Sequence, residues 1–545
     1  MPCFLERGFR GRRLLIGGLA AALCGCSASR ALPVATNGFS ASTESFRTSI
    51  QFVINIPKGH RRSHYISTAT QSISIKTYDA THTSLLSTTI SNLTPSSPGC
   101  VGASASTSCS IAIDVPAGPY TFDVTTYDKT GAAGHALSAL ADYPFTVIAG
   151  KANAIPLTLG GLAASFNIVL SNAPQATYTS STGISITGSK PQQIRIFALD
   201  ASGHTIVGGG APAPVIDATP ASTTLAASGP NTWTMTSTYA SATNPTIPAN
   251  VTLSVTATPV PGSGGTTLHA AIPVQLYDPW IYVVDVTART LFAYDESGTQ
   301  KTLSGGFLGI NAAYGATYVP GTNWVYVSDE AVSRMKVYDV AGTAVTPSAS
   351  TPFPNLSAPY QSAFDSHDGL IYVPNYTGNS ITGYDAQGNQ QTVPSFNLGG
   401  SFLNAPIAML YDPHNTFLYI ANYGNSTVAA YNEQGIQETD QASTFKNLSG
   451  PAGLAFDPRD NFIYVANESA GVTAYDESGA QQTLGGSFNG TSNPAGVAYD
   501  PYDGLLYVAN YGGANVTAYD EQGNQQTLTG TFSGLSHPWG IFVVP

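Results

Sequence analysis

The sequence has few charged residues: Asp, Glu, Lys and Arg make up only 10% of its 545 positions. This scarcity argues against a coiled coil, a helical bundle or a charged disordered tail. Basic residues are scarcest, with 20 Lys and Arg against 32 acidic residues and a formal net charge of −12. Because a nucleic-acid interface needs clustered positive charge to neutralise phosphates, we expect no nucleic-acid partner.

Long hydrophobic runs are also missing. The apolar run at residues 14–23 has ten residues and follows four arginines within residues 7–13. A basic segment followed by a short apolar run is typical of a secretory signal, whereas ten residues are too few to cross a hydrocarbon core of ~30 Å. No other segment approaches the length of a transmembrane helix, so we expect an exported protein.

Cysteine is rare in the body of the chain. Three of the five cysteines lie within the first 26 residues, which leaves Cys100 and Cys109. Two cysteines without histidine partners do not make a zinc site. In an oxidising compartment they are expected to form a disulfide, and the alternative is a pair of free thiols.

Glycine, proline and tyrosine are plentiful, at 55, 36 and 29 residues, which suits an all-β chain of short strands and tight turns. The C-terminal half repeats a Tyr-Asp or Tyr-Asn pair with a glycine three residues after the Asp or Asn. Four short strands in about 44 residues are the signature of a β-propeller blade. The tyrosines of these pairs are Tyr294, Tyr338, Tyr384, Tyr431, Tyr475 and Tyr519.

The two ends of this repeat region complement each other. The first repeat begins with its second strand at Trp280, and residues 538–544 match an inner strand with no blade after it. We therefore expect the last strand to complete the first blade, which buries both sheet edges. The prediction is a six-bladed propeller over residues 277–545.

The repeat motifs point to a family. Pro-Ala-Gly-Val-Ala-Tyr-Asp at 494–500, Leu-Tyr-Val-Ala-Asn at 506–510 and Val-Thr-Ala-Tyr-Asp at 516–520 resemble NHL and YVTN-type bacterial propeller repeats. The resemblance implies the fold but leaves the function open, because such propellers include scaffolds, binding proteins, lactonases and lyases.

The N-terminal motif Leu23-Cys24-Gly25-Cys26 resembles a bacterial lipobox. The resemblance implies a signal peptide at 1–25, lipidation of Cys26 and a polar tether at 26–45. The expected location is the cell envelope, with the lipid in a membrane; the outer membrane or cell surface is favoured over the periplasmic side. The alternative is an ordinary cleaved signal with incidental cysteines.

Residues 46–276 differ from the propeller region in pattern and charge. Ser and Thr alternate with Val, Ile and Leu, which predicts two β-sandwich modules at 46–161 and 162–276, similar to Ig-like and prealbumin-like domains. Residues 27–276 hold 8 acidic and 10 basic residues, whereas residues 277–545 hold 23 acidic and only 6 basic residues. The modules are interpreted as a stalk and the acidic propeller as its head.

One face of the propeller is the candidate binding site. Loops that enter the inner strands and loops that follow the second strands share this face, and they carry aromatic, amide and carboxylate side chains. The alternative for the Asp and Asn residues is capping of the turns by bonds to the backbone. The expected ligand-binding residues are Tyr314, Tyr360, Trp539, His537, Asn375, Tyr376, Asn422, Tyr423, Asn510 and Tyr511.

The catalytic alternative has weaker support in the sequence. SMP-30-type lactonases have this architecture and hold a divalent cation, for which the candidate ligands here are Asp329, Glu330, Asn467 and Glu468. The two glutamates belong to repeats on opposite sides of the ring, and His537 has no placed acid–base partner, as a propeller lyase would need.

We therefore expect a non-catalytic binding or assembly head without a cofactor. Its expected partner is a protein, peptide or glycan of the cell envelope, and the oligomeric state is left open. The Asp-Pro turns, such as the one at 500–503, are interpreted as hairpin turns rather than calcium loops.

Overall fold

A computed structural model describes residues 47–57, 66–171, 175–392, 403–432, 435–437 and 445–545. The described part is built from strands, with three short 3-10 helices, which confirms the predicted all-β class. The helices are η1 (Thr130–Ala132), η2 (Glu330–Val332) and η3 (Tyr423–Asn425). None of the helices described is long and apolar enough to cross a membrane. The predicted signal peptide, Cys26 and the tether lie outside the described residues.

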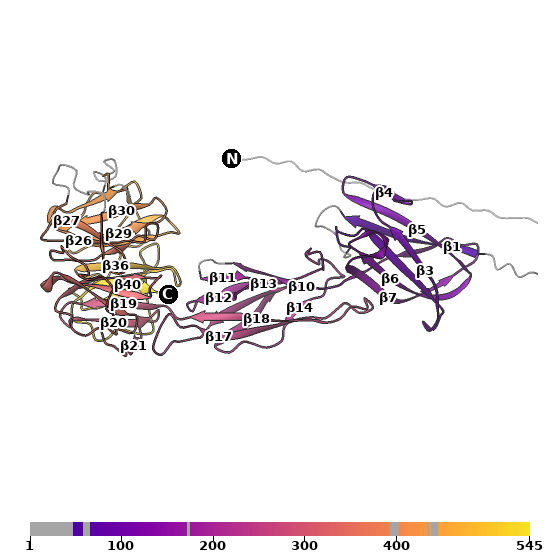
Figure 1. Cartoon of the computed structure of the whole chain (residues 1–545), viewed down its shortest axis with the longest axis horizontal. Coiled ribbons are helices and arrows are strands. Elements are labelled where there is room, and N and C mark those ends of the chain that lie inside the picture. Colours follow the sequence, from indigo (N-terminus) through magenta and orange to yellow (C-terminus); the bar gives the residue numbers. More distant parts are fainter. Residues whose placement is uncertain (1–46, 58–65, 172–174, 393–402, 433–434, 438–444) are drawn as a thin grey trace, which may run out of the picture.

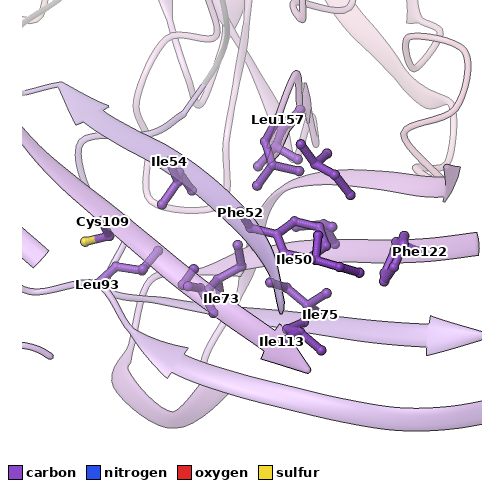
Figure 2. Close-up of a cluster of buried hydrophobic side chains, with 14 of the residues drawn as sticks. Ile50, Phe52, Ile54, Ile73, Ile75, Leu93, Cys109, Ile113, Phe122 and Leu157 are labelled. Carbon is purple, nitrogen blue, oxygen red and sulfur yellow. The ribbon is translucent and has the colours of Figure 1, made fainter. Parts of the chain in front are cut away.

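Residues 47–161 form two facing sheets, ordered β4-β5-β1-β8 and β3-β2-β6-β7-β9. Alternate residues of β1 are buried, so that Ile50, Phe52 and Ile54 point into one core. They meet Ile75 and Phe122 of the second sheet (Figure 2), and the rings of Phe52 and Phe122 lie 5.3 Å apart, edge to face. The strands are β1 (Arg47–Pro57), β2 (Ser72–Tyr78), β3 (Leu85–Asn92), β4 (Cys100–Gly102), β5 (Ser106–Pro116), β6 (Gly118–Tyr127), β7 (Ala136–Val147), β8 (Asn153–Pro156) and β9 (Gly160–Gly161).

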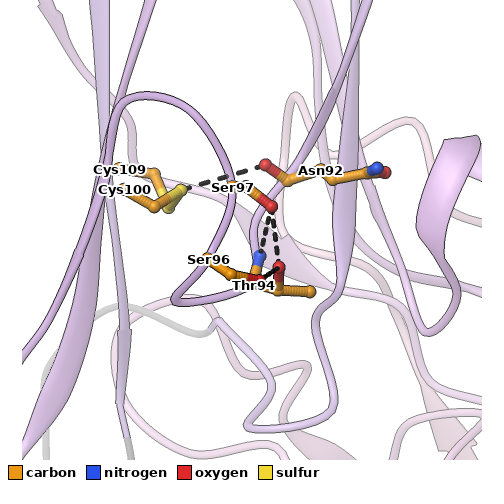
Figure 3. Close-up of a disulfide and its surroundings, with 6 residues drawn as sticks. All are labelled: Asn92, Thr94, Ser96, Ser97, Cys100 and Cys109. Atoms are coloured by element: carbon orange, nitrogen blue, oxygen red, sulfur yellow. Dashed lines mark hydrogen bonds between the residues drawn. A yellow bond between two sulfur atoms is a disulfide. The ribbon is translucent and has the colours of Figure 1, made fainter.

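The predicted disulfide between Cys100 and Cys109 is confirmed. The two residues lie directly opposite each other on β4 and β5 (Figure 3). The loop before β4 is held by its own hydroxyl groups, because the Ser97 side chain bonds to both the amide and the hydroxyl of Thr94, at 3.2 and 2.7 Å. The disulfide therefore ties the short edge strand β4 to its sheet.

Residues 165–277 form a second pair of sheets, ordered β10-β13-β16-β15 and β11-β12-β18-β17-β14. Ile194 and Ile196 of one sheet share a buried cluster with Val255 and Leu276 of the other. The strands are β10 (Ser165–Ser171), β11 (Ala176–Thr179), β12 (Gly183–Thr187), β13 (Gln192–Leu199), β14 (Pro214–Ile216), β15 (Thr223–Gly229), β16 (Thr232–Ser237), β17 (Ala249–Ala257) and β18 (Leu268–Tyr277). We call residues 162–277 the middle module.

Within the described residues from 280 to 544, six sheets of three or four strands follow one another, which agrees with the predicted propeller. They are β19 (Trp280–Asp285), β20 (Thr290–Asp295) and β21 (Gln300–Lys301) with β40 (Pro538–Val544); β22 (Ala313–Val319), β23 (Trp324–Asp329) and β24 (Arg334–Asp339); β25 (Ala363–Phe364), β26 (Ile371–Asn375), β27 (Ser380–Tyr384) and β28 (Gln390–Gln391); β29 (Pro406–Asp412), β30 (Phe417–Asn422) and β31 (Thr427–Tyr431); β32 (Pro451–Asp457), β33 (Phe462–Asn467), β34 (Gly471–Asp476) and β35 (Gln481–Gln482); and β36 (Pro494–Asp500), β37 (Leu505–Asn510), β38 (Asn515–Tyr519) and β39 (Gln525–Gln526).

The two ends of this region share one sheet. Strand β40 pairs antiparallel with β19, with Trp280 opposite Val544, as the sequence predicted for the last strand. The edge of β19 is therefore covered by the end of the chain, and the ring of sheets is closed by backbone hydrogen bonds.

The Tyr-Asp repeat has a structural explanation, seen in the last repeat. The buried Tyr519 hydroxyl donates to the main-chain oxygen of Asn489 at 2.8 Å, and its ring lies 5.1 Å from the ring of Phe488. The carboxylate of Asp520 accepts the main-chain N–H groups of Gln522 and Asn524, at 3.0 and 2.8 Å. The motif thus holds the outer turn of each repeat and explains the recurrence of these residues.

The three parts of the chain lie in a row, with the middle module between the first pair of sheets and the propeller (Figure 1). On one side, Ala141 donates its N–H to the oxygen of Gly262 at 2.5 Å. On the other side, the Gln175 side chain donates to the main-chain oxygen of Pro501 at 2.5 Å. The middle module therefore contacts both of its neighbours.

Candidate functional site

Six of the predicted ligand-binding residues form a continuous patch at one end of the propeller. The rings of Tyr314 and Tyr360 stack with their centroids 4.6 Å apart, and Trp539 stands edge-on to both, at 5.1 and 6.3 Å. Tyr376 extends the patch from Tyr360 at 5.3 Å, and Tyr511 extends it from Trp539 at 5.5 Å. We call this patch the aromatic face; its residues are Tyr314, Tyr360, Tyr376, Tyr511, His537 and Trp539.

The aromatic face is half-buried, and the carboxylate of Glu330 lies close enough to Tyr314 and Tyr360 to add to the rise that burial causes in the pKa of their hydroxyls. The indole Nε1 of Trp539 has no hydrogen-bond partner, although little of that atom is exposed. Burial raises the pKa of the Tyr314 and Tyr360 hydroxyls further above neutral pH, where an ordinary tyrosine is already protonated. The ring of His537 lies 4.7 Å from Tyr511, and its Nδ1 is 2.8 Å from the Thr287 hydroxyl. The patch therefore offers ring faces together with N–H and O–H donors.

Gln361 was not among the expected residues. It follows Tyr360 at a position where the other repeats have Gly or Ala, and this departure from the repeat was the signal available in the sequence. Its side-chain amide donates to the Ala316 oxygen at 2.8 Å, and a Cβ on Gly540 would lie 2.8 Å from its Oε1. The Gln361 side chain thus occupies space that the missing side chains of Gly315 and Gly540 leave open. It places an amide beneath the aromatic face, between repeats.

The remaining tyrosine of the prediction lies at the rim with a carboxylate. Tyr423 donates its hydroxyl to Glu468 Oε2 at 2.8 Å, and this hydrogen bond raises the pKa of the Tyr423 hydroxyl. Tyr423 and Glu468 come from neighbouring repeats, so the pair connects two loops. The Glu468 carboxylate also lies close enough to Tyr360 to add to the rise that burial causes in the pKa of its hydroxyl.

The asparagines of the prediction lie deeper than the rings. Asn375, Asn422 and Asn510 are fully buried, and each side-chain oxygen accepts an N–H from the loop that enters the same sheet. The donors are the main-chain N–H groups of Ser357, Asn404 and Ser492, at 2.9, 3.1 and 3.0 Å. These asparagines therefore hold the entering loops in place rather than the turns after the second strands, which the alternative interpretation named, and the aromatic rings form the accessible surface.

The candidate cation ligands of this end are also tied to the backbone. Asp329 is buried, accepts the N–H of Ala312 at 2.9 Å and pairs with Lys336 at 3.1 Å. Asn467 accepts the N–H of Ser449 at 3.2 Å and donates to Thr473 Oγ1 at 3.0 Å. In the described part of the chain, no cluster of three His, Cys, Asp or Glu side chains includes any of these ligands.

A cavity of about 380 Å³ lies between the inner strands of the ring. Its lining is mostly apolar and includes Gln361 at the side of the aromatic face and Tyr318, Tyr502 and Pro545 toward the opposite end. The aromatic face and the cavity are therefore two separate features of the propeller.

Comparison with known proteins supports the propeller. A family model described as "Lactonase, 7-bladed beta-propeller" matches residues 433–537, about a fifth of the chain. No curated protein matches the sequence.

Solved structures with similarity include a nidogen/laminin complex, at 17% identity over 49% of this chain and 98% of that chain, with a TM-score of 0.39. A protein of unknown function from Bacteroides thetaiotaomicron has 14% identity over 67% of this chain and 94% of its own, with a TM-score of 0.38. A gluconolactonase from Xanthomonas campestris has 17% identity over 42% of this chain and 76% of its own, with a TM-score of 0.32.

Proposed function

We propose that this chain is a lipoprotein of the cell envelope whose propeller binds a ligand on the aromatic face without chemical conversion. In this proposal the six sheets are six blades, and the two pairs of sheets before them are Ig-like or prealbumin-like sandwiches that serve as a stalk. The closure of the ring by β40 supports six blades. The lipobox at Cys26 supports the anchor, with the outer membrane or cell surface as the favoured location.

The observation that carries the binding role is the continuous aromatic face of half-buried rings. Half-buried rings contact the apolar faces of sugars or the side chains of peptides, while the tyrosine hydroxyls bind polar groups. The 23 acidic and 6 basic residues of the propeller region disfavour polyanions. The proposed ligand is therefore an uncharged or cationic glycan or peptide of the envelope.

The test is capture of ligands from glycan and peptide arrays by the purified chain, comparing Trp539→Ala with the unmodified protein. The exchange removes the ring that contacts Tyr314, Tyr360 and Tyr511, so we expect capture to fall at least tenfold. Tyr318→Ala is the matched control, because Tyr318 is a half-buried aromatic residue at the other end of β22. Equal capture by both variants and the unmodified chain would contradict the proposal.

A second candidate function is lactone hydrolysis assisted by a divalent cation. It is favoured by the lactonase family model, whose matched segment includes Asn467 and Glu468. If the chain is a lactonase, lactone hydrolysis should require a divalent cation. The exchange Glu468→Gln should then abolish hydrolysis. The same glutamine exchange leaves ligand capture by the rings largely intact if binding is the function. Absence of hydrolysis with calcium, magnesium, manganese and zinc over a panel of lactones would reject this candidate.

The proposed anchor has its own test. Cys26→Ser removes the thiol that would be acylated, so labelling with a fatty-acid analogue should disappear and the chain should be released from membranes. Continued acyl labelling of the variant would show that Cys26 is not the lipidated residue.

A further inference from the structure

A second cluster of polar side chains lies far from the aromatic face, where the propeller meets the middle module. Glu296 follows β20, Asp500 ends β36 and Asp503 lies in the hairpin turn after it. One carboxylate oxygen from each of the three residues lies within 4.8 Å of the others. The closed ring places the first and last repeats side by side, which brings together residues about 200 positions apart in the sequence.

Asp500 and Asp503 are buried, Glu296 is half-buried, and two carboxylate oxygens of the cluster have no partner. Asp500 is 0% exposed; its Oδ1 accepts the N–H of Tyr502 at 2.7 Å, whereas its Oδ2 accepts no hydrogen bond. Glu296 Oε2 accepts the N–H and the hydroxyl of Ser189, at 3.1 and 2.8 Å, whereas its Oε1 is likewise unpartnered and buried. Buried carboxylate oxygens without a partner destabilise the fold unless a proton or a cation compensates them.

The positive charges of Lys190 and Arg459 offset part of the rise that burial causes in the pKa of Asp503, but neither side chain reaches ion-pair distance. Among the described residues, no Lys or Arg nitrogen lies within the 4.0 Å of an ion pair with Glu296, Asp500 or Asp503. The nearby Arg459 is directed to Asp457 at 2.8 Å and to the Gly504 oxygen at 3.0 Å. In the absence of an ion, burial raises the pKa of Glu296 to about 7 and that of Asp500 far above its usual range, and Asp503 adds to both shifts.

The surroundings are built for the Glu296 side chain. Gly188 of the middle module has φ of +82°, and a Cβ at that position would lie 2.6 Å from Glu296 Oε1. The absence of a side chain at Gly188 therefore lets the backbone approach the carboxylate. Asp503 Oδ1 accepts the N–H of Leu505 at 2.8 Å, and the Tyr507 hydroxyl donates to Asp503 Oδ2. Both ends of the cluster are thus fixed by hydrogen bonds to the protein.

Equivalent aspartates in other repeats show what is special here. Asp412 and Asp457 end their inner strands as Asp500 does, and each accepts an N–H two residues further on. Asp457 is neutralised by Arg459, whereas Asp412 also has an unpartnered Oδ2 but belongs to no cluster of three carboxylates in the described residues. The capping role of the aspartate is therefore common to the repeats, and the convergence of three carboxylates is confined to Asp500.

We propose that Glu296, Asp500 and Asp503 bind a divalent cation, preferentially Ca²⁺, at the junction of the middle module and the propeller. Hard cations bind carboxylate oxygens, and Ca²⁺ with ligands at about 2.3–2.6 Å fits oxygens that lie within 4.8 Å of one another. Ser189 of the middle module holds Glu296 in this arrangement. The ion therefore stabilises the contact between stalk and head, and it is independent of ligand binding on the aromatic face.

The experiment uses the full chain, freed of metal with a chelator, and titrates it with Ca²⁺ and Mg²⁺ by calorimetry. Terbium luminescence sensitised by Tyr502 and Tyr507 provides a second measure of occupancy. We expect one Ca²⁺ per chain, a rise of the melting temperature with Ca²⁺, and at least tenfold weaker binding after Glu296→Gln or Asp503→Asn. Asp412→Asn is the matched control and should bind Ca²⁺ as the unmodified chain does.

Two results would overturn the proposal. The first is a metal-free chain that shows neither binding heat nor a shift in melting temperature with Ca²⁺ or Mg²⁺, which would mean that the cluster holds protons instead. The second is unchanged Ca²⁺ affinity in the Glu296→Gln and Asp503→Asn variants. Because the first result needs only the unmodified chain, the proposal stays testable even if a variant fails to fold.

Discussion

Asp412 should make the propeller less stable as the pH rises, and replacing it should remove this effect. The side chain is 0% exposed, its Oδ1 accepts the N–H of His414 at 2.9 Å, and its Oδ2 has no partner. Burial raises the pKa of Asp412 from 3.8 to about 6, with the nearby Glu477 carboxylate adding to the shift. The structure therefore favours the protonated acid over the carboxylate at this position.

The sign and size of the effect follow from this pKa. Because the folded state binds the proton more tightly than the unfolded chain does, the free energy of unfolding falls as the pH rises from 3.8 to about 6. A shift of about two units corresponds to a loss of about 3 kcal/mol at neutral pH, at 1.36 kcal/mol per unit. Asp412→Asn keeps an oxygen for the His414 N–H and does not ionise, so this loss should be absent in the variant.

The assay is urea unfolding of both proteins between pH 4 and pH 7.5, followed by the tyrosine and tryptophan signals of the propeller. Any constant cost of burying the amide cancels in the comparison across pH, as do the titrations of groups that do not interact with Asp412. The measured quantity is the free energy of unfolding of the variant minus that of the unmodified chain. We expect this difference to increase between pH 4 and pH 7.5, by about 3 kcal/mol at most. A difference that is constant from pH 4 to pH 7.5 would refute this reasoning.

Two further predictions concern the disulfide of the first pair of sheets and the pairing of β40 with β19 in the propeller. Replacing Cys100 and Cys109 by serine should lower the unfolding free energy of the first pair of sheets by roughly 2.5 kcal/mol, as expected for a disulfide that closes a loop of this size. The thermal transition of the propeller should stay unchanged, and its loss would contradict the prediction. Deleting residues 538–545 removes the strand that pairs with β19, so the propeller should lose its cooperative thermal transition; a truncated chain that melts as before would show that closure is not required.

Much of the propeller could be predicted from the sequence because its pattern is local and repeated. The strand that ends in Tyr519 alternates apolar and polar residues, and the Asp520 turn follows in every repeat in nearly the same form. By contrast, β3 gives little signal in the sequence, because most of its residues are exposed and its side chains show no regular alternation of buried and exposed positions. Edge strands of this kind are fixed by pairing with β2 rather than by their own hydrophobic pattern.

The aromatic face was predictable in its members but not in its contacts. Alignment of the repeats places Tyr314, Tyr360 and Trp539 at equivalent positions, and the ring geometry then makes them touch. The cluster of Glu296, Asp500 and Asp503 was not predictable from the sequence. Glu296 meets Asp500 only because the ring closes, and Ser189 meets Glu296 only because the middle module packs against the propeller. Contacts between distant segments of this kind leave no periodic signal in the sequence.

The most direct test of the central claim is a crystal structure of the chain with the glycan or peptide captured on the arrays. The account predicts that the ligand lies over the rings of Tyr314, Tyr360 and Trp539, with a polar group bonded to a tyrosine hydroxyl of the aromatic face. A ligand bound in the cavity beyond Gln361, or on the surface of the stalk, would contradict the assignment of the aromatic face as the binding site.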